Sequence, residues 1–258
     1  MGRALPLLCL SAALGCAPGE VAGDIASSAA SPVHPTLHTI RWALDWDLDG
    51  VEWTPDGISI TNDLGVTFVV AGGVLLDDSL VAVPCADTVA DVGWERWLGV
   101  GSAHADHSAF ADPSSFEEQQ IEPLAAPAAR TLGDRSFDPT SYCTVHWLVA
   151  RADEGTESDG VDLSGVALSL QARWSGPDGE GALSFETEWT NGALLDLTIE
   201  EARQSGEAVA AEITVVRSLG GLFDGVDPAT QSELAIAWSV LENLMAGSRL
   251  RVEVLDAL

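Results

Sequence analysis

His104 and His107 are the side chains of this chain whose types and spacing most directly indicate chemistry. They form the segment His-Ala-Asp-His within a long stretch that lacks strand periodicity, and function concentrates in such loops. If the loop turns here, both imidazoles can reach one ion, with Asp106 or a third histidine completing the shell. His146 is the candidate third ligand. Nitrogen and oxygen ligands of this kind suit Cu(II) or Zn(II). The alternative is that these are solvated loop histidines, because H-x-x-H also arises by chance.

The stretch DWDLDG offers a second set of metal-ligating side chains, spaced as in a calcium-binding EF-hand loop. These are Asp45, Asp47 and Asp49. Two features oppose the calcium interpretation. The twelfth loop position is Asp56, which is shorter than the usual glutamate, and Trp46 and Leu48 continue the apolar face of a strand. A strand that ends in an acidic turn explains all of these residues, so we expect no calcium here.

No catalytic motif is present. The sequence has no G-x-S-x-G, no P-loop and no G-x-G-x-x-G. Cys143 and His146 could be written as a thiol–imidazole dyad, but residues i and i+3 lie on opposite faces of a strand. A cysteine that is exported and bridged is also a poor nucleophile. We therefore expect that the protein is not an enzyme.

The N-terminus, MGRALPLLCLSAALGCAPGE, reads as an export signal. Arg3 supplies the positive charge, and the apolar run 4–14 is too short to span a bilayer. The segment Ala-Leu-Gly-Cys at 13–16 resembles a bacterial lipobox, in which the peptide is cut before Cys16 and its thiol is diacylated. No aspartate follows Cys16, so we expect an outer-membrane anchor facing the periplasm or the cell surface. An ordinary secretory signal cut near Gly19 is the alternative.

The charge balance restricts the possible partners. The formal net charge is −29, and the eleven basic residues are all arginine. Such a surface repels nucleic-acid backbones, so DNA and RNA are excluded as partners. We expect contact with the membrane through the lipid anchor. Divalent cations are compatible with this charge, and the sequence does not identify a protein partner.

The remaining cysteines indicate a disulfide. Cys9 leaves with the signal and Cys16 takes the lipid, so Cys85 and Cys143 are left as a pair. In an oxidising compartment two free thiols are disfavoured. A bridge between these cysteines would stabilise the fold by about 4 kcal/mol on the chain-entropy model. Cys85 continues the face of Val81 and Val83, and we expect both cysteines to point inward.

Elements rich in alternating apolar residues must position these side chains. We divide the chain into a signal peptide (1–15), a flexible tether rich in Ala, Ser, Pro and Gly (16–36) and one domain (37–258). Period-two alternation predicts strands at 38–48, 65–70, 73–83, 142–149 and 250–255. A turn is expected at Gly72-Gly73. The stretch 99–140 reads as irregular.

Two hairpins and one helix complete the prediction. The hairpins pair 166–174 with 182–189 and 194–200 with 210–217. The helix is expected to begin at Asp227 as N-cap, with Pro228 in the first turn and an apolar face that recurs at helical spacing. That face consists of Leu234, Trp238, Leu241 and Met245. The predicted fold is mostly β, an antiparallel β-sandwich with one short C-terminal helix.

Three segments together resemble the methanobactin-associated copper-binding protein family, the MbnP-like domain. They are IRWALDWDLDG (40–50), TNDLGVTFVVAGGVLL (61–76) and GLFDGVD (221–227) with the helix that follows. The resemblance spans roughly 37–255. It implies a β-sandwich in an exported, often lipid-anchored protein that binds copper, in some members through histidines and an oxidised tryptophan. The family's histidine motifs do not map securely onto His104, His107 or His146.

We therefore expect an exported, lipid-anchored and non-catalytic copper-binding protein, with the metal held by the loop histidines. The alternative is a surface lipoprotein that binds a protein or a saccharide without metal.

Overall fold

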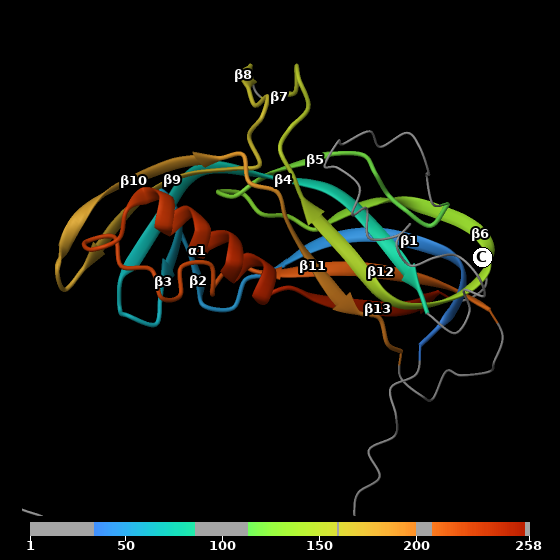
Figure 1. Ribbon diagram of the computed structural model, residues 1–258. Coiled ribbons are helices and arrows are strands. Elements are labelled where there is room, and N and C mark those ends of the chain that lie inside the picture. Colours follow the sequence, from blue (N-terminus) through green and yellow to red (C-terminus); the bar gives the residue numbers. More distant parts are fainter. Residues whose placement is uncertain (1–33, 86–112, 159, 200–207, 256–258) are drawn as a thin grey trace, which may run out of the picture. The chain divides into compact units, whose positions relative to one another are not determined.

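Strands dominate the part of the chain that the computed structural model describes, which comprises residues 34–85, 113–158, 160–199 and 208–255 (Figure 1). The predicted mostly-β fold with one C-terminal helix is confirmed. The predicted signal peptide, Cys16 and nearly all of the tether lie outside the described residues.

The elements follow one another along the chain with a single helix near the end. They are β1 (Thr36–Asp47), β2 (Val51–Thr54), β3 (Gly57–Thr61), β4 (Thr67–Pro84), β5 (Gln120–Pro123), β6 (Arg130–Val149), β7 (Glu157–Ser158), β8 (Val161–Asp162), β9 (Leu168–Gly176), β10 (Gly179–Thr187), β11 (Asn191–Asp196), β12 (Val209–Ser218), α1 (Glu233–Ala246) and β13 (Arg249–Leu255).

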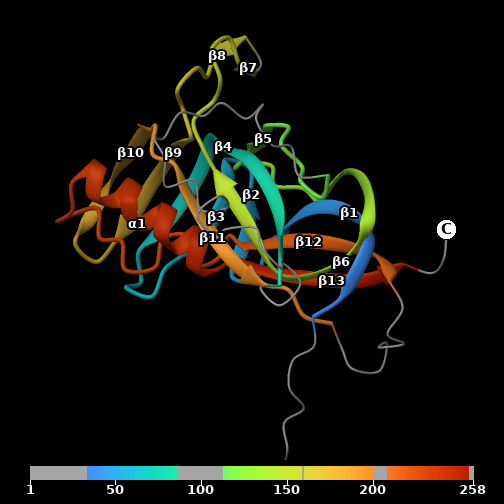
Figure 2. The same cartoon turned by 45° about the vertical axis from the view of Figure 1, so that its right-hand side comes forward.

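Eleven of the strands form one curled sheet, and the long strand β6 joins its two halves (Figures 1 and 2). The first part of β6 pairs with β1, which continues through β12 to β13. The second part of β6 lies between β4 and β11, and β4 continues through β9 to β10. The pairing of β1 with β12 is parallel, and the other pairings are antiparallel. Apolar side chains from both halves meet in one core.

Strand β1 has the predicted alternation. Ile40, Trp42, Leu44 and Trp46 are buried on its inner face. The strand ends at Asp47, and the chain turns at Gly50, whose φ of 78° lies in the left-handed region that favours glycine. The predicted strand and the predicted turn after Asp49 are confirmed.

The predicted turn at Gly72-Gly73 is wrong, because β4 runs through both glycines without a break. The pairing of β4 with β9 shifts register between Val70 and Gly72. At Gly73 φ is 124°, and a Cβ there would collide with the carbonyl oxygen of Ser169. These glycines therefore accommodate a bulge and a close approach of two backbones, which Gly residues in a strand often mark.

One predicted hairpin is confirmed and the other is wrong. β9 and β10 pair through a two-residue turn, with Gly176 opposite Gly179. β11, by contrast, pairs with β6, and β12 pairs with β1 and β13. The stretch predicted to be irregular also contains β5 and the first part of β6, which begins at Arg130.

The helix begins later than predicted. Ser232 is the N-cap of α1, and its side chain accepts a hydrogen bond from the backbone N–H of Ala235. Asp227 instead closes a separate turn, in which its carboxylate accepts from the N–H of Ala229 and from the hydroxyl of Thr230. Both sites satisfy the cap preference for Ser and Asp, so the sequence signal alone did not distinguish them.

The segments that carry the family resemblance lie against one another. Asn62 is buried and donates hydrogen bonds to the carbonyls of Phe223 (2.9 Å) and Val226 (2.8 Å). From α1, Asn243 donates to the carbonyl of Asp224 at 2.8 Å. Phe223 also stacks on Phe68, with ring centroids 4.1 Å apart. Two asparagines from distant elements thus hold one turn, 221–227, which we call the asparagine-held turn.

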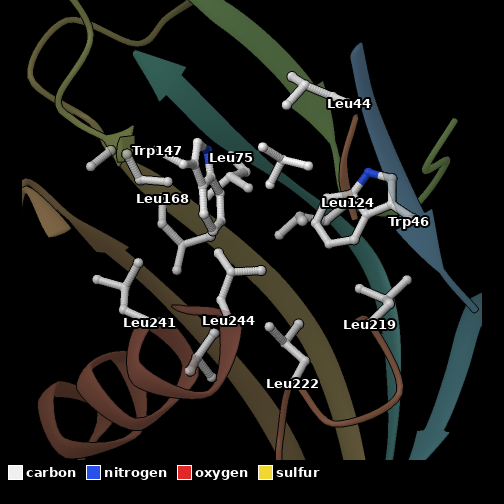
Figure 3. Packing of buried hydrophobic residues seen from close by; sticks show 14 of the residues in the cluster. Leu44, Trp46, Leu75, Leu124, Trp147, Leu168, Leu219, Leu222, Leu241 and Leu244 are labelled. Atoms are coloured by element: carbon white, nitrogen blue, oxygen red, sulfur yellow. The ribbon is translucent and has the colours of Figure 1, made fainter. Parts of the chain in front are cut away.

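Large side chains from both halves of the sheet and from α1 fill the core (Figure 3). Trp46 reaches in from β1 and Trp147 from β6, while Leu241 and Leu244 cover this region from α1. The core therefore holds β1 and β6, which carry Trp46 and Trp147 inward, in fixed positions.

Candidate functional site

The predicted metal ligands are only partly within view. His104, Asp106 and His107 lie outside the described residues. His146 lies on β6, half-buried, between Val81 of β4 and Leu194 of β11. Burial lowers the pKa of His146, since desolvation disfavours the charged imidazolium. The imidazole is therefore neutral at pH 7.

The predicted disulfide between Cys85 and Cys143 is confirmed. Both cysteines are half-buried, and the strand residues that point into the core beside Cys85 are Leu80 and Ala82, whereas we expected Val81 and Val83. The register of β4 against β6 changes between Val83 and Pro84. Cys85 therefore does not continue the alternation of Val81 and Val83.

Within the described residues, one group of three metal-ligating side chains has its ligand atoms within 4.8 Å of one another: His34, Cys85 and Cys143. The two sulfur atoms are joined to each other, and metals bind the thiolate form of cysteine. His34 donates a hydrogen bond from Nδ1 to the carbonyl oxygen of Leu197, at 2.9 Å. This group is therefore a disulfide with a neighbouring histidine, and its sulfur atoms are not in the form that binds metal ions.

Two of the three aspartates of DWDLDG are partners of arginines. Asp45 pairs with Arg251 at 3.0 Å and Asp47 with Arg249 at 2.8 Å, and both arginines lie on β13. These carboxylates belong to the outer face of β1, as the strand interpretation requires. Asp49 lies beyond the strand and is exposed.

An unpredicted charged cluster lies in the core: Arg217, Asp77 and Glu122, with the indoles of Trp46 and Trp147. The guanidinium is fully buried and lies 2.7 Å from Asp77 and 2.5 Å from Glu122. The indole N–H of Trp147 donates to Asp77 at 2.7 Å, and that of Trp46 donates to Glu122 at 3.0 Å. Arg217 also stacks over the ring of Trp46 at 4.2 Å.

The electrostatics of this buried cluster favour the protonated form of its carboxyls. Two carboxyls face one guanidinium, so full ionisation would leave a net negative charge without solvent. Desolvation raises the pKa of Glu122 to about 7, opposed by Arg217 and reinforced by the charge of Asp77. Burial raises the pKa of Asp77 as well, opposed first by Arg217. Oε1 of Glu122 has no hydrogen-bond partner and can carry the proton.

The cluster is sealed, which favours a structural role over a ligand site. The side chains of Arg217, Asp77 and Glu122 are at most 4% exposed. Most of its donors and acceptors satisfy one another, as buried polar groups require, and Oε1 of Glu122 and Nη2 of Arg217 are the exceptions. The cluster joins β4, β5, β6 and β12. Few other arrangements of these strands would keep its buried charges paired.

A groove of about 600 Å³ lies between the end of β10 and the first turns of α1. One wall is the segment Ser184–Trp189, and the other is formed by Glu233, Leu234 and Ala237. Figure 1 shows α1 passing in front of β9 and β10. The helix buries Ile236, Ala237, Val240, Leu241 and Leu244 against the sheet. We call this surface the β10–α1 groove.

Apolar side chains are exposed at the β10–α1 groove. Leu234 is 67% exposed and Trp238 is 47% exposed. Trp238 makes an edge-to-face contact with Trp189, with ring centroids 5.4 Å apart. Such a cluster on a surface marks an interaction site more often than single exposed apolar residues do.

Three carboxylates surround these apolar side chains. Glu186 and Glu188 come from the β10 side and Glu233 from the first turn of α1, and none of the described lining residues is basic. The N-terminal end of the helix contributes roughly half a positive charge, which three carboxylates outweigh. The groove therefore combines aromatic and aliphatic contact area with a negative potential.

The sequence pattern missed this groove. Leu234 and Trp238 were predicted to face the core, because they recur with Leu241 at helical spacing. In the structure the buried stripe runs through Ala237 and Leu244, so Leu234 and Trp238 lie on its margin. A usable signal was the presence of two overlapping apolar stripes on a single helix, more than one buried face needs.

The fold and the groove define a class: a disulfide-bridged, mostly-β domain with an acidic, aromatic groove. Comparison with family models, with curated proteins and with solved structures finds no match. The resemblance to the MbnP-like domain accordingly stays a prediction. No helix among the described residues has the length and hydropathy to cross a membrane.

Proposed function

We propose that the chain is an exported, lipid-anchored, non-catalytic binding protein whose partner, a protein or a saccharide, occupies the β10–α1 groove. The contact of the exposed Trp238 with the half-buried Trp189, beside Leu234, is the observation that carries this proposal. Export and lipid attachment are supported by the lipobox-like segment that ends at Cys16.

The physical reason is the cost of leaving this area in water. Burying an apolar side chain of this size contributes about 1.5–3 kcal/mol, and an aromatic pair adds about 0.5–1.5 kcal/mol. Leu234 forgoes most of that contribution in the free protein, and Trp238 forgoes nearly half of it. A partner that covers them recovers it, and tryptophan is enriched in the centres of interfaces for this reason.

Fluorine NMR of protein labelled with 5-fluorotryptophan tests the proposal. The panel of probes consists of short basic, acidic and neutral peptides and of neutral oligosaccharides. At least one class should shift the resonances of Trp189 and Trp238, because a bound partner changes the surroundings of both rings. Trp42, fully buried in the core, should not shift.

A matched variant locates the effect. Trp238→Ala should abolish the shift of Trp189, whereas Trp53→Ala, which removes another exposed tryptophan away from the groove lining, should preserve it. The proposal is overturned if no class of probe shifts either resonance, or if the shift of Trp189 survives in Trp238→Ala.

Copper binding by His104 and His107 is a second candidate function, supported by their spacing and by the family resemblance. The segment that carries them follows β4, which pairs with β6 so that Val81 lies opposite His146. The neutral imidazole of His146 has the form that binds metal ions.

A copper titration tests this candidate. His104→Ala with His107→Ala should weaken the tightest Cu(II) site by at least about tenfold, which corresponds to about 1.4 kcal/mol. The titration must use less copper than protein, because forty carboxylates also bind copper weakly. His34→Ala with His38→Ala is the matched control. Equal affinities in wild type and the His104/His107 variant would eliminate the histidine site.

A further inference from the structure

Strand β10 is a free edge of the sheet at the β10–α1 groove. Among the described strands it pairs with β9 alone. In a two-residue hairpin the residues that flank the turn form a hydrogen-bonded pair, and such pairs alternate along the ladder. Counting from Gly176 opposite Gly179, the residues Phe185 and Thr187 direct their backbone groups to β9. Ser184 and Glu186 therefore direct their N–H and C=O groups away from β9, into the groove.

The two faces of this edge differ in chemistry. Phe185 and Thr187 are buried on the inner face, toward α1, whereas Ser184, Glu186 and Glu188 are exposed on the outer face. The inner side of the open edge is bounded by Leu234 and Trp189. A strand placed along the edge would thus meet carboxylates on one face and apolar side chains on the other.

We propose that the partner is an extended peptide segment that alternates basic and apolar residues and adds to β10 as an antiparallel strand. This inference rests on the proposed function and narrows it to one class of ligand. Residues opposite Ser184 and Glu186 donate and accept backbone hydrogen bonds and carry the basic side chains beside Glu186 and Glu188. The residues between them point toward Leu234 and Trp189 and are apolar.

Charge decides between the possible occupants. Charged side chains on an edge strand discourage pairing with a strand of like charge. A second copy of this chain carries a formal charge of −29, so it is repelled from Glu186 and Glu188. A basic segment is attracted by the same carboxylates. Strand addition also satisfies the two outward-facing backbone positions, which a saccharide does not do in a regular ladder.

Capped five-residue peptides test the inference in the intact protein. Lys-Val-Lys-Val-Lys spans about 16 Å at roughly 3.3 Å per residue and matches the open edge. It should bind, and the acidic Glu-Val-Glu-Val-Glu should not. N-methylation of the central lysine amide removes a donor to β10 and should weaken binding at least about tenfold, or 1.4 kcal/mol. N-methylation of a valine amide, which faces away from β10, should change it little.

The two N-methylated peptides carry the same charge, so a difference between them cannot arise from general attraction to an acidic protein. On the protein side, Ser184→Pro removes the outward N–H alone, and proline is tolerated on the free side of an edge strand. It should weaken binding of the basic peptide about as much as lysine N-methylation. Glu52→Gln, outside the groove lining, is the charge control.

Equal binding of the two N-methylated peptides would overturn strand addition. If the basic peptides fail while an oligosaccharide shifts the resonance of Trp238, the inference is wrong and the groove function stands. If no probe perturbs the groove, both the strand-addition inference and the proposed groove function are wrong.

Discussion

At the scale of single residues, Arg217 is the most consequential side chain that the structure describes. It is fully buried, contacts two carboxyls and lies over the rings of two indoles. Buried ion pairs contribute little net stability compared with apolar packing, but removing one partner leaves an uncompensated charge. This cluster therefore selects one arrangement of β4, β5 and β12 more than it adds to the free energy of unfolding.

The proton on the buried cluster predicts an unusual pH dependence. The pKa of Glu122 is about 7 in the folded protein against an ordinary value of 4.5. Between these values the folded state binds more protons than the unfolded state, so the free energy of unfolding falls as pH rises. The slope from this group is at most about 1.4 kcal/mol per pH unit.

Glu122→Gln does not titrate, so its stability should fall less steeply over the same pH window. Urea unfolding of both proteins at several values between about pH 4.5 and pH 7.5 measures the difference. Exposed acids contribute similarly to both curves and cancel. Parallel curves for the two proteins would contradict the raised pKa of Glu122.

At the scale of elements, the asparagine-held turn joins parts of the chain that are far apart. The side chain of Asn62 donates to two carbonyls of the turn and accepts from the N–H groups of Leu64 and Val66. One buried amide thus satisfies four backbone groups. The position of α1, and with it one wall of the β10–α1 groove, depends on this turn.

Asn62→Ala should lower the free energy of unfolding by about 3 kcal/mol, because each buried group left unsatisfied costs about 1–3 kcal/mol. Asn243→Ala is the matched comparison. Its amide holds the same turn but is only partly buried, so the loss should be smaller. Urea unfolding measures both, and a smaller loss for Asn62→Ala than for Asn243→Ala would contradict this account.

At the scale of the whole molecule, the fold must withstand the mutual repulsion of its many carboxylates. Six of the described arginines pair with carboxylates: Arg41, Arg135, Arg173, Arg217, Arg249 and Arg251. Exposed pairs of this kind contribute at most about 1 kcal/mol each. The covalent bridge between Cys85 and Cys143 is a stronger restraint, because it closes a loop over a sequence separation of 58.

Replacing both cysteines, Cys85→Ala with Cys143→Ala, should lower the free energy of unfolding by about 4 kcal/mol on the chain-entropy model. The β4–β6 ladder beside the bridge should persist, since its backbone hydrogen bonds do not depend on sulfur. Urea unfolding of the oxidised wild type and of the double variant measures the loss. A difference below about 1 kcal/mol would show that the unfolded chain is little restrained by the bridge.

The sequence by itself determined several of the strands and the apolar faces of those strands, but not β5 or the first part of β6. Period-two alternation identified β1, the end of β6 and the β9–β10 hairpin, because side chains on a strand alternate between core and solvent wherever it pairs. Cysteine arithmetic identified the disulfide for a similar reason, since only two cysteines were left to pair. These are local properties or matters of counting.

Only the tertiary structure decided which strands are neighbours and which charges are buried. The backbone ladder is the same for any partner, so nothing in β11 or β12 alone indicates that they pair with β6 and β1. Arg217 and Asp77 are 140 residues apart in the sequence. Each would be predicted to lie on the surface, because its partner is not apparent from the sequence. The β10–α1 groove likewise depends on tertiary structure, because its two walls are a helix and an edge strand that are distant in sequence.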